Sequence, residues 1–365
     1  MSDLSIKQYV FRRGAAKRIP VSGTFELTSR CNLNCKMCYV HLSPEEQSKI
    51  GDELTTAEWI TLGKDAVDEG MLYLLLTGGE PLLRQDFEEI YTSLIKMGLF
   101  MTINTNGTLL TSEILKCLKK YRPEKVNITL YGMSECTYGA LCGNAHGFCD
   151  AVQAIQKLKE AGVRVNLNTT FTRYNIDDMK DIVAFAKKME IPIRMSSYIF
   201  PPVRSPHNTE EVNLSAEELG KASAQFDLLT MNKEQIEKRK EYIRSCIRKK
   251  VNGNEKMESK ISSCLAGRGA FWISWDGKMY PCGMLSEYVQ DIRYYTFHEA
   301  WKNTCESIKQ LLLPPECSVC KYQPLCASCA AVSQTMYSTS NIVVQEMCVK
   351  TKTYAETFLN PYTSE

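Results

Sequence analysis

Short apolar runs alternate with amphipathic stretches between residues 24 and 200 of the chain. The apolar runs have the length of buried strands, and six strands are expected, at 24–27, 71–79, 99–107, 125–132, 163–171 and 191–200. The stretches between them repeat apolar residues every three or four positions, which predicts helices at 55–70, 86–98, 112–121, 150–162 and 176–190. Gly70, Gly98 and Gly162 stand where glycine commonly follows the last helical residue.

This alternation predicts an α/β fold with a parallel sheet, because two parallel strands need a crossover segment between them. Six β/α units indicate a sheet that is curled as a partial (β/α)6 barrel or left open. A charged tract at 215–250 predicts one or two long surface helices that end this part of the chain. After it the periodicity fades and cysteines become frequent, through Cys348.

Six unusual short motifs follow the six predicted strands. In parallel α/β folds, the loops after the carboxyl ends of the strands carry the chemistry. The motifs, in chain order, are CNLNCKMCY (31–39), TGGEP (77–81), NTNG (104–107), YGMSECTYG (131–139), TRYN (172–175) and SYIFPP (197–202). We therefore expect them to converge on one site.

Composition and charge exclude several classes of protein. The chain has 365 residues with 44 basic and 42 acidic side chains, so its net charge of +2 leaves no basic excess for nucleic-acid phosphates. No apolar run is long enough to span a bilayer, and the first twenty residues lack the apolar core of an export signal. We predict a soluble, cytoplasmic protein that binds neither nucleic acid nor membranes.

Sixteen cysteines are unusual for such a protein, since disulfides are rare in the cytosol. Clustered cysteines in that compartment more often bind metal. Only four histidines are present, and none stands at zinc-finger spacing from a cysteine pair. Ligation by sulfur alone indicates either iron–sulfur clusters or zinc held by four cysteines.

Cys31, Cys35 and Cys38 have the spacing C-x3-C-x2-C. Three thiolates leave one iron of a four-iron cluster with an open coordination position. The alternative is a zinc ion whose fourth ligand comes from elsewhere. The motif resembles the signature of the radical S-adenosylmethionine (SAM) superfamily. The resemblance implies that the amine and carboxylate of SAM chelate the open iron, and that an electron cleaves SAM to methionine and a hydrogen-abstracting 5′-deoxyadenosyl radical.

The same resemblance implies further contacts to SAM. The family's Gly-Gly-Glu, whose backbone and carboxylate hold the methionyl ammonium, matches Gly78, Gly79 and Glu80. Polar contacts to the ribose and carboxylate are implied for Thr105, Asn106 and Thr129. Met37 stands where the family usually has an aromatic residue, and Tyr39 could supply the missing ring. Taken singly, these residues could also form a turn or cap strand ends.

The C-terminal third holds seven more clustered cysteines, at Cys264, Cys282, Cys317, Cys320, Cys326, Cys329 and Cys348. Two CxxC pairs alone would indicate a zinc ribbon, but seven cysteines exceed one tetrahedral site. The set, with Gly277 inside WDGKMYPC, resembles the SPASM domain of radical SAM enzymes that mature peptides and proteins. That resemblance implies two auxiliary four-iron clusters, and therefore three 4Fe-4S clusters in the protein.

The family also implies how these cysteines divide between the two auxiliary clusters. The distal cluster would take Cys317, Cys320, Cys326 and Cys348. The proximal cluster would take Cys264, Cys282 and Cys329, and a substrate thiolate, Cys246 or Cys305 could fill its fourth position. The sequence departs from the family pattern in two places: the last CxxC pair has two intervening residues instead of three, and no second cysteine lies between Cys264 and Gly277.

Cys136, Cys142 and Cys149 lie in the tract after the fourth strand, which should roof the site. One of them could return a hydrogen atom to a substrate radical, as in epimerising relatives. The alternative is that they are small buried thiols, which is what we expect of Cys117.

These inferences divide the chain into a basic N-terminal arm (1–22), a radical SAM partial barrel (23–210), a helical linker (211–258) and a SPASM-like domain with a C-terminal helix (259–365). The predicted reaction modifies a peptide or protein, by a thioether or carbon–carbon crosslink or a related oxidation. The alternatives are a small-molecule dehydrogenase, a sulfatase-type formylglycine maturase and a non-enzymatic zinc-binding module. The implied partners are the substrate, a flavodoxin- or ferredoxin-type electron donor and a separate leader-peptide-binding protein.

Overall fold

The computed structural model describes residues 5–196, 198–202, 209–248, 264–326 and 329–361. Its centre is one nine-stranded sheet with the order β6-β5-β4-β3-β2-β1-β7-β8-β9. The first six strands are parallel and are β1 (Ser22–Glu26), β2 (Tyr73–Thr77), β3 (Phe100–Thr105), β4 (Lys125–Thr129), β5 (Val165–Thr170) and β6 (Ile193–Ser196). The predicted α/β fold with six parallel strands is confirmed. β2 to β6 are shorter than their apolar runs because each run continues into the loop, whereas β1 begins two residues before its run.

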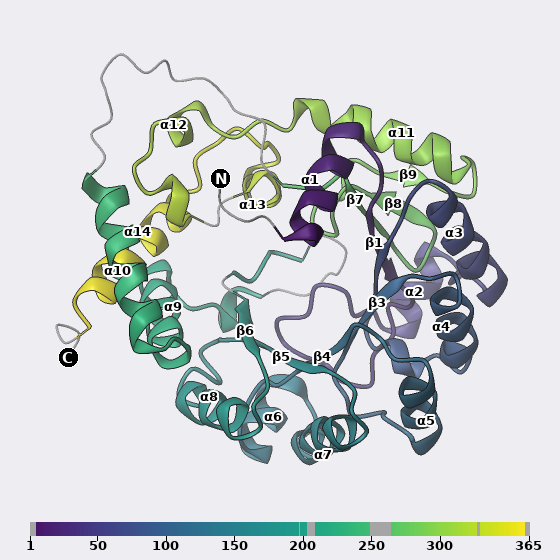
Figure 1. The fold of residues 1–365 in the computed structure, drawn as a ribbon, viewed down its shortest axis with the longest axis horizontal. Coiled ribbons are helices and arrows are strands. Elements are labelled where there is room, and N and C mark those ends of the chain that lie inside the picture. Colours follow the sequence, from purple (N-terminus) through teal and green to yellow (C-terminus); the bar gives the residue numbers. More distant parts are fainter. Residues whose placement is uncertain (1–4, 197, 203–208, 249–263, 327–328, 362–365) are drawn as a thin grey trace.

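Five predicted helices follow the outer rim of the curved sheet (Figure 1). They are α3 (Thr56–Asp68), α4 (Phe87–Ile95), α5 (Ser112–Lys120), α7 (Gly147–Glu160) and α8 (Met179–Lys188). Each buries one apolar stripe against the sheet, as Trp59, Ile90 and Ile155 illustrate, all of them fully buried. The glycines at 70, 98 and 162 have positive φ just past three of these helices, as predicted.

Three helices that precede the charged tract at 215–250 were not predicted from the apolar pattern. They are α1 (Ile6–Lys17), α2 (Pro44–Ile50) and α6 (Glu135–Cys142). Side-chain caps form where the sequence offers them: Ser5 and Gln8 form a capping box on α1, and Ser43 and Glu46 form one on α2. α1 and α2 bury little of their surface, so their sequences carry no apolar stripe that would mark a helix.

The charged tract forms two helices, α9 (Ala216–Thr230) and α10 (Lys233–Arg248). α9 packs along the C-terminal helix α14 (Gln345–Leu359). A Cβ added at Gly220 would lie 2.6 Å from the carbonyl oxygen of Lys350, so glycine is required for the two backbones to approach this closely. α9 contacts β6, so the two paired helices lie at the β6 end of the sheet (Figure 1).

The C-terminal part adds three strands to the same sheet. They are β7 (Ala270–Ile273), β8 (Lys278–Tyr280) and β9 (Gln290–Asp291). β7 pairs in parallel with β1, with Ser22 opposite Ala270, and β8 and β9 continue antiparallel. The boundary expected at 258/259 lies outside the described residues, and the sheet joins the parts of the chain on either side of it.

The remaining elements are short or close the C-terminal part. They are α11 (Phe297–Ser307), α12 (Pro315–Ser318), α13 (Ala330–Tyr337) and the 3-10 turns Pro81–Leu83, Glu210–Val212, Ile308–Gln310 and Gln323–Leu325. α11 covers β7, where Phe297 and Trp301 meet Phe271 edge to face. Among the described residues, no helix is long and apolar enough to cross a bilayer.

Candidate functional site

A cavity of about 360 Å³ opens at the carboxyl ends of the parallel strands. We call it the strand-end cavity. Five of the six motifs contribute residues to its wall. TRYN (172–175) contributes none, and Thr170, the last residue of β5, lines the wall instead. Met284 from the C-terminal part closes one side. The predicted site residues in its wall are Cys31, Cys35, Cys38, Tyr39, Gly78, Gly79, Thr105, Asn106 and Thr129. The convergence of the motifs follows from the parallel sheet, which brings successive strand ends to one edge.

Hydrogen bonds to α6 hold the loop that carries the three N-terminal cysteines. Asn34 N donates to the carbonyl oxygen of Cys142 and Lys36 N to that of Leu141, both at 3.0 Å. Leu33 is buried and anchors the loop in the core. Backbone N–H groups also point at sulfur, since Leu33 N lies 3.4 Å from Cys31 Sγ. The sulfur atoms are therefore positioned by the fold.

The environment of these thiols favours their protonated form unless a cation binds. Burial raises the pKa of Cys31 to about 12 and that of Cys38 to about 11. A hydrogen bond with Cys142, together with burial, raises the pKa of Cys35. A metal centre would reverse this, because a coordinating thiol is deprotonated. Among the described residues no further cysteine lines the cavity, so this donor set fits a cluster with one iron left open for another ligand.

Gly78 and Gly79 bring the loop after β2 against the loop after β1. Gly79 N donates to Thr28 O at 2.7 Å, and Glu80 N donates to Arg30 O at 2.8 Å. A Cβ on Gly78 would lie 2.6 Å from Thr28 O, and one on Gly79 would collide with the carbonyl of Arg30. Only glycine permits this approach, and it leaves backbone rather than side chain at the cavity wall.

Glu80 is fully buried and lies behind the cavity wall. Its carboxylate accepts hydrogen bonds from Thr105 Oγ1 and Asn106 N, both at 2.7 Å, and from Leu82 N at 3.0 Å. Burial raises the pKa of this carboxyl to about 7, although the three hydrogen bonds oppose the rise. In this structure the carboxylate ties the end of β3 to the end of β2. The Gly-Gly-Glu motif indicated that Glu80 contacts SAM, and it gave no sign that the carboxylate connects the ends of β2 and β3.

Asn106 continues the chain of polar contacts toward the cysteines. Its Nδ2 donates to Asn32 Oδ1 at 3.0 Å and lies 3.8 Å from Cys31 Sγ. Sequence reasoning missed other wall residues, which are Tyr131, Ser196, Tyr198, Phe200 and Met284. Four of these belong to or adjoin the predicted strand-end motifs, so the motif positions were the available signal. Met284 had none.

The four cysteines assigned to the distal auxiliary cluster surround one small cavity of about 70 Å³. They are Cys317, Cys320, Cys326 and Cys348. Burial, together with the other three thiols, raises the pKa of Cys317 to about 11. The chain thus brings residues 31 positions apart into one sulfur-rich site, which fits a cluster or a metal ion.

The cysteines assigned to the proximal cluster lie closer to the strand-end cavity. Cys282 and Cys329 pack against an apolar group that includes Met284 and Leu285. Tyr39 and Phe200 pack on the same group and also line the strand-end cavity. Cys264 is an electrostatic neighbour of Cys329.

Cys246 and Cys305 are the two candidates from this chain for the fourth ligand of the proximal cluster. The described contacts bring neither of them to Cys264, Cys282 or Cys329. Cys305 is buried on α11 in the main core, where its charged neighbours are Arg18 and Glu306. Cys246 is buried on α10.

The three candidate hydrogen donors lie away from the cavity wall. Cys142 is fully buried beneath the cysteine loop, beside Cys35. Cys136 is exposed, and Cys149 Sγ donates to Glu135 Oε1 at 3.4 Å. Of the three, Cys142 is nearest to the site, and its contact is with a predicted cluster ligand. Cys117 is buried on α5, as expected.

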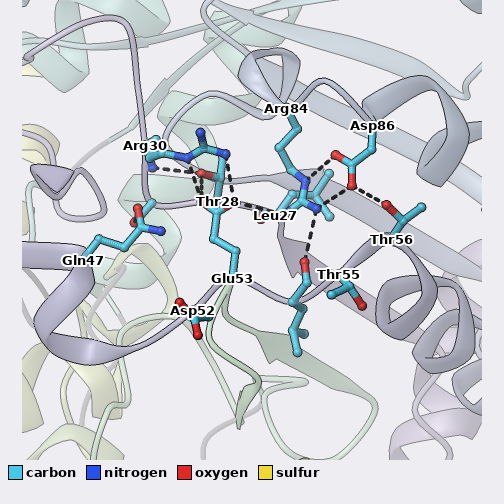
Figure 2. A network of polar contacts seen from close by, with 12 residues as sticks. Leu27, Thr28, Arg30, Gln47, Asp52, Glu53, Thr55, Thr56, Arg84 and Asp86 are labelled. Atoms are coloured by element: carbon cyan, nitrogen blue, oxygen red, sulfur yellow. Dashed lines mark hydrogen bonds and ion pairs between the residues drawn. The ribbon is translucent and has the colours of Figure 1, made fainter.

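A buried arginine supports the loop from the other side. Arg84 donates to the carbonyl oxygens of Leu27 at 3.0 Å and Leu54 at 3.2 Å, and it forms ion pairs with Glu53 and Asp86 (Figure 2). Glu53 also accepts from Arg30, which directly precedes the first cysteine. The network fixes the exit of β1, from which the cysteine loop begins.

Comparison with known proteins identifies relatives of two kinds. The radical SAM superfamily model matches residues 25–186. An AdoMet-dependent heme synthase of Methanosarcina barkeri is 30% identical over 330 residues, 84% of this chain and 90% of the relative. The sporulation killing factor maturation protein SkfB of Bacillus subtilis is 28% identical over 271 residues, 72% of this chain and 60% of that protein. Streptococcus suis SuiB bound to its precursor peptide SuiA shares the fold, with a TM-score of 0.67 and 14% identity over 94% of this chain and 80% of SuiB.

Proposed function

Since the chain belongs to the radical SAM superfamily, we propose that Cys31, Cys35 and Cys38 hold the SAM-binding 4Fe-4S cluster in the strand-end cavity. When bound, that cluster supplies the electron that cleaves SAM into methionine and a 5′-deoxyadenosyl radical able to abstract hydrogen from a substrate. The protein's own part is to position the three sulfur atoms and to present polar backbone and side-chain groups to SAM.

Different residues of the cavity wall have different roles in binding SAM. Gly78 and Gly79 leave room and backbone groups for the methionyl end. Glu80 holds Thr105 and Asn106 in place, and these two face the cavity. Apolar and aromatic groups on the remaining sides surround the reacting atoms and restrict the entry of water.

The substrate in this proposal is a peptide or protein, and its modification is an oxidative crosslink or a related oxidation. The observation that carries the proposal is the apolar group shared by Cys282, Cys329 and the cavity residues Tyr39 and Phe200. In this proposal Cys282 and Cys329 belong to a second, sulfur-rich centre beside the reaction cavity, where an auxiliary cluster could accept the leftover electron. The named roles of SkfB, a maturation protein, and of SuiB with its precursor peptide support the same assignment.

A second function, oxidation of a small carboxylated molecule, is supported by a different observation. The match to AdoMet-dependent heme synthase spans most of both chains, whereas the match to SkfB covers 60% of that protein. Under this alternative the two auxiliary cysteine groups would serve electron transfer in the same way.

One experiment separates the two. The reconstituted protein is supplied with SAM and a reductant, and 5′-deoxyadenosine is measured with peptides encoded by the flanking genes or with an iron porphyrin that carries propionates. We expect a peptide to stimulate 5′-deoxyadenosine formation and to lose two hydrogen atoms by mass spectrometry. Stimulation by the porphyrin alone would reject the peptide proposal and favour the second function.

A further inference from the structure

A second cavity, of about 230 Å³, lies behind the segment that follows β6. We call it the side cavity. Ser196, Tyr198 and Ile199 line both cavities, so a single layer of side chains separates them. Its volume is that of roughly eight water molecules at about 30 Å³ each. A group of a few atoms held there would lie next to the strand-end cavity.

Lys350 on α14 brings a positive charge into the wall of the side cavity. The residue is only 6% exposed, and within the described part of the chain its ammonium makes no hydrogen bond or ion pair. Glu346 stands one turn earlier and lines the same cavity, yet no ion pair joins the two. Burying an ammonium without a hydrogen-bonded partner is unfavourable, so a lysine in this position is suited to bind an anion that enters the cavity.

A third cavity on the other side of Lys350 offers no free counter-charge. Asp227 and Arg239 line that cavity together with Lys350. The Asp227 carboxylate accepts from the Tyr354 hydroxyl at 2.6 Å, and Arg239 Nε donates to the same hydroxyl at 3.0 Å. These groups satisfy one another. Among the described residues no carboxylate forms an ion pair with Lys350, and Cys326, which is assigned to the distal cluster, is the neighbour that favours its charged form.

Asn213 lines the side cavity and holds an unused acceptor. Its backbone is fixed, because Asn213 N donates to Glu210 O at 3.2 Å and Arg173 Nε donates to Asn213 O at 2.8 Å. Its side-chain Oδ1 is buried and has no hydrogen-bond partner among the described residues. Buried polar atoms are rarely left unpaired, so this oxygen lacks a donor that a ligand could bring.

We infer that the side cavity binds a carboxylate of the substrate, with Lys350 pairing with the carboxylate and Asn213 Oδ1 accepting from a neighbouring N–H. A carboxylate beside an amide N–H is the pattern at the C-terminal residue of a peptide. This inference rests on the proposed function and specifies which end of a peptide is held. The apolar walls, which include Phe171 and Met336, strengthen the charge interaction by excluding water.

The test is an anaerobic calorimetric titration of the reconstituted holoprotein with N-acetylglycine, its neutral amide and propionate. N-acetylglycine has both groups, the amide lacks the charge, and propionate lacks the N–H. We expect N-acetylglycine to bind saturably and the amide to bind at least about tenfold more weakly, since a hydrogen bond to a charged group is lost. Propionate should fall between them, and Asn213→Ala should bind N-acetylglycine and propionate alike.

Variants on one helix test the role of the lysine. Lys350→Met should weaken N-acetylglycine binding at least about tenfold, and Lys350→Arg should retain it. Lys352→Met is the matched control, because Lys352 is exposed on the same helix and pairs with Glu356. Its N-acetylglycine titration should match that of the wild type. Circular dichroism and iron content establish that each variant is folded and loaded.

Three results would overturn the inference. The first is equal N-acetylglycine binding by the wild type and Lys350→Met. The second is equal binding of N-acetylglycine and its neutral amide by the wild type. The third is an altered reduction potential of the distal cluster in Lys350→Met while N-acetylglycine binding is unchanged. The last result would make Lys350 a counter-charge for the cluster near Cys348. If propionate bound the wild type as tightly as N-acetylglycine, the peptide C-terminus would be rejected as the source of the carboxylate. Saturable N-acetylglycine binding by a protein that never cleaves SAM would reject the proposed function and leave the side cavity standing.

Discussion

Replacing Arg84 with methionine should destabilise the protein and loosen the cysteine loop. The arginine side chain is 6% exposed and donates to two carbonyl oxygens and two carboxylates. Removing one partner of a buried ion pair costs about 3–5 kcal/mol, because the other charge is left uncompensated. Asp86 is partly exposed and can rehydrate, and Glu53 keeps Arg30 as a partner. We therefore expect a loss of about 3 kcal/mol, a large share of a typical domain's about 5–15 kcal/mol.

The assay is anaerobic urea unfolding of the reconstituted protein, followed by circular dichroism. Arg84→Lys keeps the charge but has three donors in place of five, so its loss should be intermediate. Arg164→Met, at an exposed position, is the control and should stay within about 0.5 kcal/mol of the wild type. Iron content should fall in Arg84→Met, since Leu27 and Arg30 lead into the cysteine loop. A destabilisation below about 1 kcal/mol with full iron content would refute the reasoning.

Three further predictions concern the site itself. Changing Cys31, Cys35 and Cys38 together to alanine should lower the iron content from roughly twelve to about eight atoms per chain and abolish SAM cleavage; a wild-type content near four would reject the auxiliary clusters. Gly79→Ala should weaken SAM binding measured by equilibrium dialysis, because the new Cβ would push the loop away from Arg30; unchanged affinity would contradict the close approach. Glu80→Gln should alter the pH dependence of thermal stability. Burial raises the carboxyl pKa from 4.5 to about 7, so its stabilising contribution is present below pH 4.5 and declines by about 3 kcal/mol as the pH rises through 7. The melting temperature of the variant, relative to that of the wild type, should therefore rise between pH 5 and 8. A difference in melting temperature that stays constant over this range would contradict the reasoning.

The sequence predicted the sheet and the convergence of its motifs because both depend on local patterns. The period of the apolar residues and the positions of the glycines defined the β/α units. Parallel strands bring the loops that follow them to the same edge of the sheet. The cysteine spacing was equally local. The apolar pattern could not give the pairing of β7 with β1, since a four-residue apolar run such as AFWI occurs in strands and helices alike.

Interactions between distant residues were beyond prediction for a different reason. Arg84, Glu53 and Leu27 become neighbours only after β1 and β2 pair, and each looks ordinary in sequence. Lys350 also reads as a surface residue of a charged helix, and only the packing of α9 against α14 buries it. Burial of a charge is a tertiary property, so it has no signature in the local pattern.

The pairing of β1 with β7 has a consequence for biosynthesis. The N-terminal strand next to the first cysteine motif receives its second neighbour only when residues 270–273 are made, almost 250 residues later. At about 5–20 residues per second, the ribosome needs roughly 12–50 seconds to cover that distance. Throughout this interval one edge of β1 is open, and the apolar side of its sheet lacks the cover of α11. Loading of iron into the first motif should therefore follow synthesis of residues 270–273, and a truncation before residue 270 should yield a protein that aggregates rather than a free-standing barrel.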